Sequence, residues 1–342
     1  MSQVVSHNIV ISVYKESELE IINFHLETLS KINFKRNIIF NIVSNPDIYE
    51  LSIATLKCPN NIILKHIKGV DSFFTPYDEG SYHHAANLSI AMHTITLNYN
   101  GIITFIDPDF IFICRNFSDV ITDLHLKGNV IIGMHWDKTS TTKWRDFVAP
   151  HFFSINMKDI LVDTISFYPL LDVSEKKRNI AASLKKIIIS LQTTILKYPA
   201  AFTLVPLFTY LKMEISFDTL SYFRLLAKKF DIKIHLFRNQ LNIHNYQDIM
   251  RVRKNFPVIF RNWLPELIGV IPRTDYNLTK SFIKEKYPKQ YENMRPEEIS
   301  YKNKLFGIHM RTVKNFHRDK SLESQQLLFL KTIYNDQTGF KI

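Results

Sequence analysis

Short runs of apolar, often β-branched residues alternate with stretches of helical spacing through the first hundred residues. Residues 4–13, 37–43 and 61–67 are such runs, and each is followed by residues typical of a loop. Between the first two runs, Ile22, Leu26 and Leu29 recur at intervals that predict an amphipathic helix. Buried strands that alternate with helices predict a mostly parallel sheet with helices on both of its faces.

The alternation continues to a strand that ends in two aspartates. A helix is predicted over residues 82–97, where apolar residues recur at helical spacing. Residues 101–106 are almost continuously apolar, as expected of a central strand buried on both faces, and they run directly into Asp107-Pro108-Asp109. Further strands are predicted over residues 110–113, 129–134 and 147–155.

The second half of the chain has a less regular pattern. Residues 176–198 predict a long helix with an aliphatic stripe and six basic residues, and residues 222–229 predict a shorter helix. From residue 251 onward the charge rises, the apolar runs shorten and prolines interrupt the pattern. We therefore expect an α/β fold with a core over residues 1–160, a helical insertion over residues 161–250 and a C-terminal extension over residues 251–342.

Charge and hydropathy limit the classes of protein. The formal net charge of +11 favours anionic partners, which include nucleotide diphosphates, anionic membranes and nucleic acids. No apolar run reaches the roughly 20 residues that a bilayer-spanning helix needs. Ser6, His7 and Asn8 interrupt any leader-like run, and Cys58 and Cys114 lack the spacing of a metal or redox pair. A cytoplasmic protein with reduced thiols is expected.

Asp107 and Asp109 are the strongest candidates for chemistry. In an open α/β sheet, ligands bind beyond the carboxyl ends of the strands, and these two acids directly follow the predicted central strand. Two carboxylates alone repel a diphosphate, but Mg²⁺ or Mn²⁺ can bind carboxylate and phosphate oxygens together. The alternative is a turn in which both aspartates accept backbone amides and no ligand is needed.

Three ordered segments resemble landmarks of the GT-A fold glycosyltransferases, a broad superfamily that uses nucleotide sugars. They are residues 9–14, residues 80–88, and residues 103–109 with the Asp-x-Asp sequence, so the resemblance covers residues 4–160. It implies a Rossmann-like core that holds the nucleotide base at the end of the first strand and a metal at the Asp-x-Asp. It also implies Mn²⁺ or Mg²⁺ as cofactor and a nucleotide-diphosphate sugar as donor substrate.

The resemblance places several residues of the core around the donor. Ser12, Val13, Tyr14 and Glu16 would surround the base and ribose, Asn45 would stand at the end of the second strand, and His84 would meet phosphate or sugar hydroxyls. His83 and His84 point in different directions on a helix, so at least one of them is structural. A plain turn at residues 45–47 and a packing role for Tyr14 are the alternatives.

Further along the chain, the resemblance implies a late histidine at the metal. His309 would join Asp107 and Asp109 as a ligand, and Arg311 would bind phosphate. The sequence departs from the family here, because Thr312 and Val313 replace the glycines that usually follow.

The acceptor side offers three acids. Asp218 would remove the proton of the acceptor hydroxyl as the catalytic base, unless it only caps the helix that follows. Asp137 and Asp146 are its rivals, since Trp136 and Trp144 beside them suit stacking on sugar faces.

These features predict a hexosyltransferase-like glycosyltransferase of polysaccharide biosynthesis. It would act on a glycan, lipid-linked or protein acceptor, with residues 161–250 on the acceptor side and residues 251–342 closing on the site. A metal-dependent nucleotidyltransferase or phosphohydrolase would use the same carboxylates, but no Walker-type phosphate loop accompanies them. No nucleic acid is expected as a partner, because the basic residues are spread along the chain without a nucleic-acid-binding motif.

The helix predicted over residues 176–198 has two interpretations. It packs in the core with a solvated basic face, or it lies in the headgroup layer as a peripheral contact with the inner face of the membrane.

Overall fold

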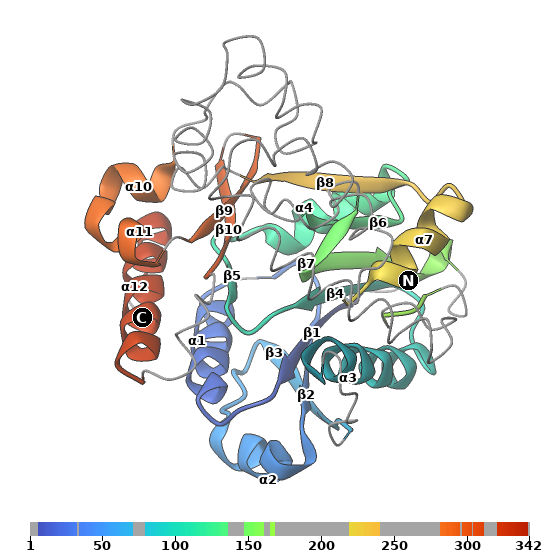
Figure 1. Ribbon diagram of the computed structural model, residues 1–342, viewed down its shortest axis with the longest axis horizontal. Coiled ribbons are helices and arrows are strands. Elements are labelled where there is room, and N and C mark those ends of the chain that lie inside the picture. The colour runs from blue at the N-terminus through green and yellow to red at the C-terminus, as the bar shows by residue number, and fades with distance from the viewer. Residues whose placement is uncertain are drawn as a thin grey trace, which may run out of the picture.

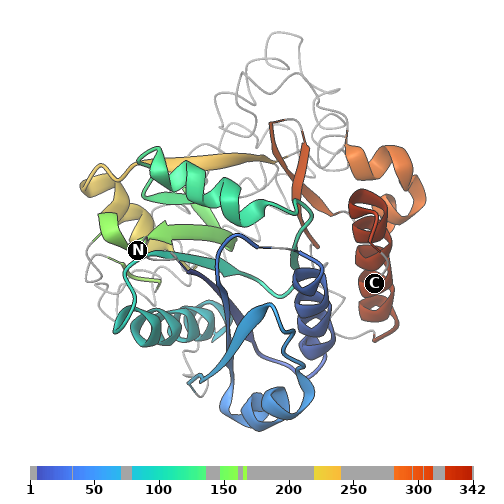
Figure 2. The same cartoon turned by 180° about the vertical axis from the view of Figure 1, so that it is seen from behind.

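The computed structural model describes residues 6–32, 34–70, 79–135, 147–160, 165–167, 219–239, 281–294, 296–302, 304–310 and 320–340. Within them, one sheet of ten strands is flanked by helices on both faces (Figures 1 and 2). The predicted α/β, Rossmann-like fold is therefore confirmed. The helix expected over residues 176–198 lies outside the described residues, and none of the described helices is long and apolar enough to cross a bilayer.

Four parallel strands form the first part of the sheet. β1 (His7–Val13), β2 (Ile38–Ser44), β3 (Ile62–Lys68) and β4 (Ile102–Ile106) lie in the order β3-β2-β1-β4. The chain thus builds outward from β1 to β3 and then crosses back to the other side of β1 (Figure 1). The gap between the carboxyl ends of β1 and β4 is the switch point, where open α/β sheets bind ligands.

The sheet then continues through strands of mixed direction. β7 (Val148–Asn156) is antiparallel to both β4 and β6 (Ile131–His135), and β8 (Ile234–Asn239) runs parallel to β6. Of the seven strands from β3 to β8, only β7 is reversed, so this part of the sheet is mostly parallel. The antiparallel strands β9 (Glu297–Tyr301), β10 (Lys304–His309) and β5 (Phe110–Phe112) complete the order.

Alternate side chains of β1 enter two different cores. Ile9, Ile11 and Val13 pack with α1 (Glu18–Ser30) and α4 (Phe117–Leu126), whereas Val10 packs with α3 (Glu79–Thr96) and α7 (Ser221–Lys229). β1 is buried on both faces for this reason. A third core joins Phe24 of α1 to α12 (Lys320–Thr338) and to α10 (Phe282–Lys286) and α11 (Pro288–Met294) (Figure 1).

Several elements differ from the sequence prediction. The expected turn at residues 45–47 opens the helix α2 (Pro46–Thr55), because Asn-Pro signals a helix start as well as a turn. α4 and β8 were not predicted, although both are regular. The extension from residue 251, expected to be loosely patterned, contains β9, β10 and α12 among its described residues. These elements gain their regularity from tertiary contacts: β10 pairs with the distant strand β5, and α12 packs against α1.

A buried polar chain lies at the amino end of the central strands. The ring of His7 bonds the hydroxyls of Ser118 and Thr104, at 2.8 and 2.6 Å, and Thr104 donates to Ser154 at 3.0 Å. His125 completes the chain by bonding Ser154 at 2.9 Å and the carbonyl of Asn129 at 2.7 Å. Burial lowers the pKa of His7 to about 3 and that of His125 to about 4. Both rings are therefore neutral in the folded protein at neutral pH.

The neutral, buried histidines of this hydrogen-bonded network predict that the folded protein loses stability in acid. Because the unfolded histidine titrates near 6.5 and folded His7 near 3, the unfolded state takes up the proton first as the pH falls. Stability is then fully present above pH 6.5 and declines below it, by up to about 1.4 kcal/mol per pH unit for each such histidine. Between pH 6.5 and pH 4.5, His7→Gln should reduce the slope of the unfolding free energy against pH by the equivalent of about one proton, as measured by urea denaturation. Exposed His93→Gln is the control, and an unchanged slope in His7→Gln contradicts the prediction.

Candidate metal and nucleotide site

The carboxyl ends of four parallel strands meet at one edge of the sheet. β1 leads into Tyr14, β2 into Asn45, β3 into Gly69 and β4 into Asp107. The amide of Asn45 donates to the carbonyl of Val13 at 3.2 Å, and the amide of Gly69 donates to that of Ser44 at 2.7 Å. Hydrogen bonds thus hold these strand ends level, and the residues that follow them face a common region.

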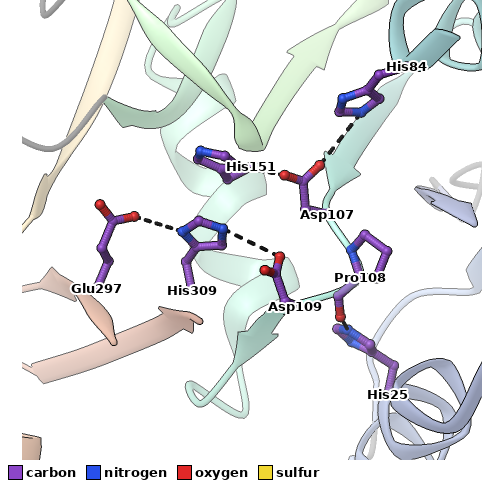
Figure 3. Close-up of polar contacts among 8 residues, drawn as sticks. All are labelled: His25, His84, Asp107, Pro108, Asp109, His151, Glu297 and His309. Atoms are coloured by element: carbon purple, nitrogen blue, oxygen red, sulfur yellow. Dashed lines mark hydrogen bonds and ion pairs between the residues drawn. The ribbon is translucent and has the colours of Figure 1, made fainter. Parts of the chain in front are cut away.

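β7 brings His151 to Asp107. The antiparallel register pairs Ile106 with Phe152, so His151 stands opposite Asp107, and the Asp107 amide donates to the His151 carbonyl at 3.0 Å. The Nδ1 atom of His151 lies 2.5 Å from Oδ2 of Asp107. On the other side of the same carboxylate, Nε2 of His84 from α3 lies 3.6 Å from Oδ1 (Figure 3).

β10 brings His309 to Asp109. β10 pairs with β5, and the amide of Met310 donates to the carbonyl of Asp109 at 3.0 Å. Nε2 of His309 lies 3.4 Å from Oδ1 of Asp109, and Nδ1 lies 2.7 Å from Oε2 of Glu297. The rings of His309 and His151 stack with centroids 4.0 Å apart, so the two halves of the cluster touch (Figure 3).

The peptide between the two aspartates is held from below by α1. Nε2 of His25 lies 2.9 Å from the carbonyl oxygen of Pro108 (Figure 3). Burial lowers the pKa of His25 to about 4, so the ring is neutral and donates its one N–H to this carbonyl. Asp107 and Asp109 are thereby fixed on either side of an anchored proline.

The charges of the cluster compensate one another. Burial opposes ionisation of Asp107, but the hydrogen bond from His151 and the attraction of the neighbouring histidines outweigh it and hold the pKa below the usual range. Burial lowers the pKa of His84. Burial likewise opposes protonation of His309, but Asp109 and Glu297 raise its pKa to about 10. Without a bound cation, protonated His309 therefore lies between two carboxylates, and a cation that binds Nε2 has to displace this proton.

The donor atoms of the cluster suit a divalent metal ion. Asp107, His151 and His309 each offer one ligand atom, and these atoms lie within 4.8 Å of one another. Asp109 lies beside these ligand atoms, because its carboxylate is close to Nε2 of His309. Two imidazoles with carboxylates form a donor set for a first-row transition ion, whereas Mg²⁺ prefers oxygen ligands alone. The residues present fit the expected metal, with His151 as a candidate ligand that the sequence did not single out.

Uncommitted hydroxyls lie on the other side of the switch point. The hydroxyl oxygens of Ser12, Tyr14 and Ser44 are buried. The Tyr14 hydroxyl lies near the side chains of Ser12 and Asn87, but none of the three hydroxyls makes a hydrogen bond of good geometry among the described residues. Burial raises the pKa of Tyr14 well above its ordinary value, so the phenol stays protonated. Buried hydroxyls without partners cost free energy, and a polar ligand at this edge can satisfy them.

Asn87 ties this side together. It is fully buried on α3, donates to Oδ1 of Asn45 at 3.2 Å and accepts the amide of Val70 at 3.2 Å. Gly69 is required beneath it, because a Cβ there would stand 2.4 Å from the Asn87 side-chain oxygen. Asn45 is therefore held by Asn87, a residue to which the sequence assigned no role of its own.

The structure brings some predicted residues together and leaves others apart. Asp107, Asp109, His84 and His309 form one cluster, while His83 bonds the carbonyl of Val70 at 3.1 Å, as expected for one structural member of the His83-His84 pair. The side chain of Val13 packs in the core beside α1.

Glu16 is exposed, and Glu18 instead accepts the amides of Tyr14 and Lys15, at 2.7 and 3.3 Å. The predicted residues Asp218 and Arg311, and their rivals Asp137 and Asp146, lie outside the described residues.

Three functional candidates escaped sequence reasoning. His25 and His151 contact residues 83 and 44 positions away in the sequence, and Glu297 meets His309 only through the register of β9 and β10. For His151 a signal existed, since it is one of only two polar residues, with Ser154, in the strand predicted over residues 147–155.

Comparison with known proteins adds little to this geometry. No family model and no curated protein matches the sequence. Among solved structures, the chain is similar to the crystal structure of mouse xyloside xylosyltransferase 1 in its apo form, with 14% identity and a TM-score of 0.37. That similarity covers 68% of this chain and 85% of the mouse chain. Because a similarity this low says nothing about activity, the function has to be inferred from the site itself.

Proposed function

We propose that the protein is a metal-dependent glycosyltransferase that moves a sugar from a nucleotide-diphosphate sugar to an acceptor hydroxyl. The observation that carries the proposal is the meeting of Asp107, Asp109, His151 and His309 at the switch point, opposite unpartnered buried hydroxyls. One side of this edge suits a cation and the other suits a polar ligand. A nucleotide diphosphate with its metal has both kinds of group.

The metal side would hold the diphosphate. Asp107, His151 and His309 would bind the cation with Asp109 beside them, and two imidazoles favour Mn²⁺ over Mg²⁺ in this role. A bound cation would offset the negative charge that develops on the leaving diphosphate. His84, 3.6 Å from Asp107, would orient that carboxylate or contact the phosphate.

The hydroxyl side would hold the nucleoside. Ser12 and Tyr14, two positions apart, lie on the side of β1 that faces α3. Asn45 lies at the neighbouring strand end, where it accepts a hydrogen bond from Asn87. Hydroxyls and amides can both donate and accept, as base edges and ribose hydroxyls require. Glu16 and the backbone of Val13 complete the proposed contacts, and Arg311 would reach a phosphate.

The residues that we propose for the acceptor side are assigned from the sequence alone. We propose residues 1–160 as the donor-binding core, residues 161–250 as the acceptor side with Asp218 as catalytic base, and residues 251–342 as the part that closes on the site. A glycan, a lipid-linked sugar or a protein would be the acceptor. The basic helix expected over residues 176–198 would serve a lipid-borne acceptor by lying on the inner membrane surface.

A nucleotidyltransferase or phosphohydrolase is the second candidate, since the same carboxylates and imidazoles would serve either reaction. Product analysis separates them. A transferase forms a glycoside and releases an intact nucleoside diphosphate. A hydrolase releases sugar phosphate or phosphate without any acceptor.

Donor binding provides the first test. Nucleotide sugars added together with Mn²⁺ should raise the melting temperature, since a ligand at 100 times its dissociation constant stabilises the folded state by about 2.7 kcal/mol. Thermal shifts with a panel of uridine and guanosine diphosphate sugars, with and without Mn²⁺, measure this. If no nucleotide sugar shifts the melting temperature under either condition, the proposed function is wrong.

Substitution of the aspartates provides the second test. Asp107→Asn and Asp109→Asn should each lower transfer by at least about 100-fold, since the lost metal contact is worth several kcal/mol in the transition state. Asp123→Asn, an exposed acid on α4, should leave transfer unchanged. Near-normal transfer by Asp109→Asn, with an unaltered metal requirement, contradicts the assignment.

The role of His151 provides the third test. His151→Ala should weaken Mn²⁺ binding by more than about 10-fold, because it removes an imidazole from the donor set. His83→Ala is the matched control, since His83 lies near the site but bonds the carbonyl of Val70. Electron paramagnetic resonance of free Mn²⁺ gives both dissociation constants. Equal affinities in the two variants exclude His151 as a ligand.

A further inference from the structure

Glu297 is a buried acid that faces the metal cluster from a strand without any other predicted site residue. Only 4% of its surface is exposed, and the same holds for His309. β9 and β10 are antiparallel, and their register places Glu297 directly opposite His309. Residues paired in this way lie on the same face of a sheet with their Cβ atoms close together. The contact is therefore fixed by backbone pairing and does not depend on a mobile loop.

The hydrogen bond between them determines which nitrogen of His309 keeps its proton when a metal ion binds. Oε2 of Glu297 lies 2.7 Å from Nδ1 of His309, and an ionised carboxylate can only accept hydrogen bonds. Nδ1 must then be the donor, so Nε2 is the nitrogen that gives up its proton and provides the lone pair when a cation binds. Nε2 is also the atom that points at Asp109, 3.4 Å away, so the nitrogen available to a metal ion faces the cluster (Figure 3).

Two contacts together fix the plane of the His309 ring. The hydrogen bond to Glu297 sets its rotation in the plane, and the stacked ring of His151, at an interplanar angle of 21° and a distance of 4.0 Å, sets its tilt. A ring held at its edge and on its face cannot turn Nε2 away from Asp109 without breaking one contact.

We infer that Glu297 is a positioning residue for the metal centre: it holds His309 in the Nδ1–H form, with Nε2 presented to a divalent ion beside Asp107 and His151. The inference rests on the metal-dependent function proposed above and names the residue on which the His309 ligand depends. Groups that bond the second nitrogen of a ligating histidine typically account for a 10–100-fold difference in metal affinity, on the order of what a test can resolve.

The next residue supplies a matched control. Glu298 is also buried, but it lies on the opposite face of β9 and serves the start of α10. It accepts hydrogen bonds from the Ser281 hydroxyl and from the amides of Phe282 and Ile283, at 2.8 and 3.3 Å for the amides. Two adjacent acids in one strand thus have different roles. Glu297 bonds a histidine of the cluster, whereas Glu298 bonds the first residues of α10.

The test uses Co²⁺ and Mn²⁺ as probes of the full chain. Glu297→Leu removes the acceptor but fills a similar volume, Glu297→Gln keeps an acceptor oxygen, and Glu298→Gln alters the neighbour. Dissociation constants come from calorimetry, and the visible absorption of bound Co²⁺ reports the ligand set. Circular dichroism and melting temperature show whether each variant is folded, and Glu297→Asp replaces the Leu variant if that one does not fold, because its shorter side chain withdraws the acceptor.

Glu297→Leu should bind both ions about 10–100-fold more weakly and shift the Co²⁺ spectrum. Glu297→Gln should keep most of the wild-type metal affinity and the wild-type Co²⁺ spectrum. Glu298→Gln should lower the melting temperature but change neither the metal affinity nor the spectrum. Wild-type affinity and spectrum in folded Glu297→Leu overturn the positioning role and leave the metal centre intact. Absence of Co²⁺ and Mn²⁺ binding by the wild type overturns the metal centre itself, and the proposed function with it.

Discussion

Two carboxylates one residue apart, Asp107 and Asp109, stand at the end of a strand that is buried on both faces. Two acids held so close together in a largely buried position need polar partners, because removing charge from water without a partner costs free energy. Histidines supply them: His151 and His84 flank the first carboxylate, and His309 lies beside the second. His151 and His309 also offer nitrogen ligands, so the contacts that hold the cluster together also suit a metal ion.

Later strands of the sheet complete this cluster. The first four parallel strands place their carboxyl ends at one edge, which gathers Tyr14, Asn45 and Asp107. The reversed strand β7 delivers His151 to that edge from its amino-terminal half. β10, paired with the short strand that follows Asp109, delivers His309. The reversed strand β7 and the carboxyl end of β10 thus each add one histidine to an edge that began with acids and hydroxyls.

The two ends of the central strands contrast in their polar groups. At the amino end, His7, Thr104, Ser154 and His125 satisfy one another in a closed, neutral chain. At the carboxyl end, the groups are charged or, as with Ser12, buried without a described partner. Satisfied networks stabilise a fold, whereas unsatisfied groups at a strand end are those a ligand can complete. This contrast supports the carboxyl ends of β1 and β4 as the place of the proposed site.

The sequence by itself determined the α/β class, the first four strands and the position of Asp107 and Asp109, because these follow from local hydrophobic periodicity and from the break after a buried strand. It also marked His309 and Asn45, although it treated residues 45–47 as a turn where the structure begins α2. It did not find His25, His151 or Glu297, nor the helix α12 that packs against α1. These depend on strand register and on contacts across as many as 306 positions, such as the Tyr334 hydroxyl on the Thr28 carbonyl. Periodicity reports which residues are buried within one element, but only tertiary structure decides which buried polar groups of different elements meet.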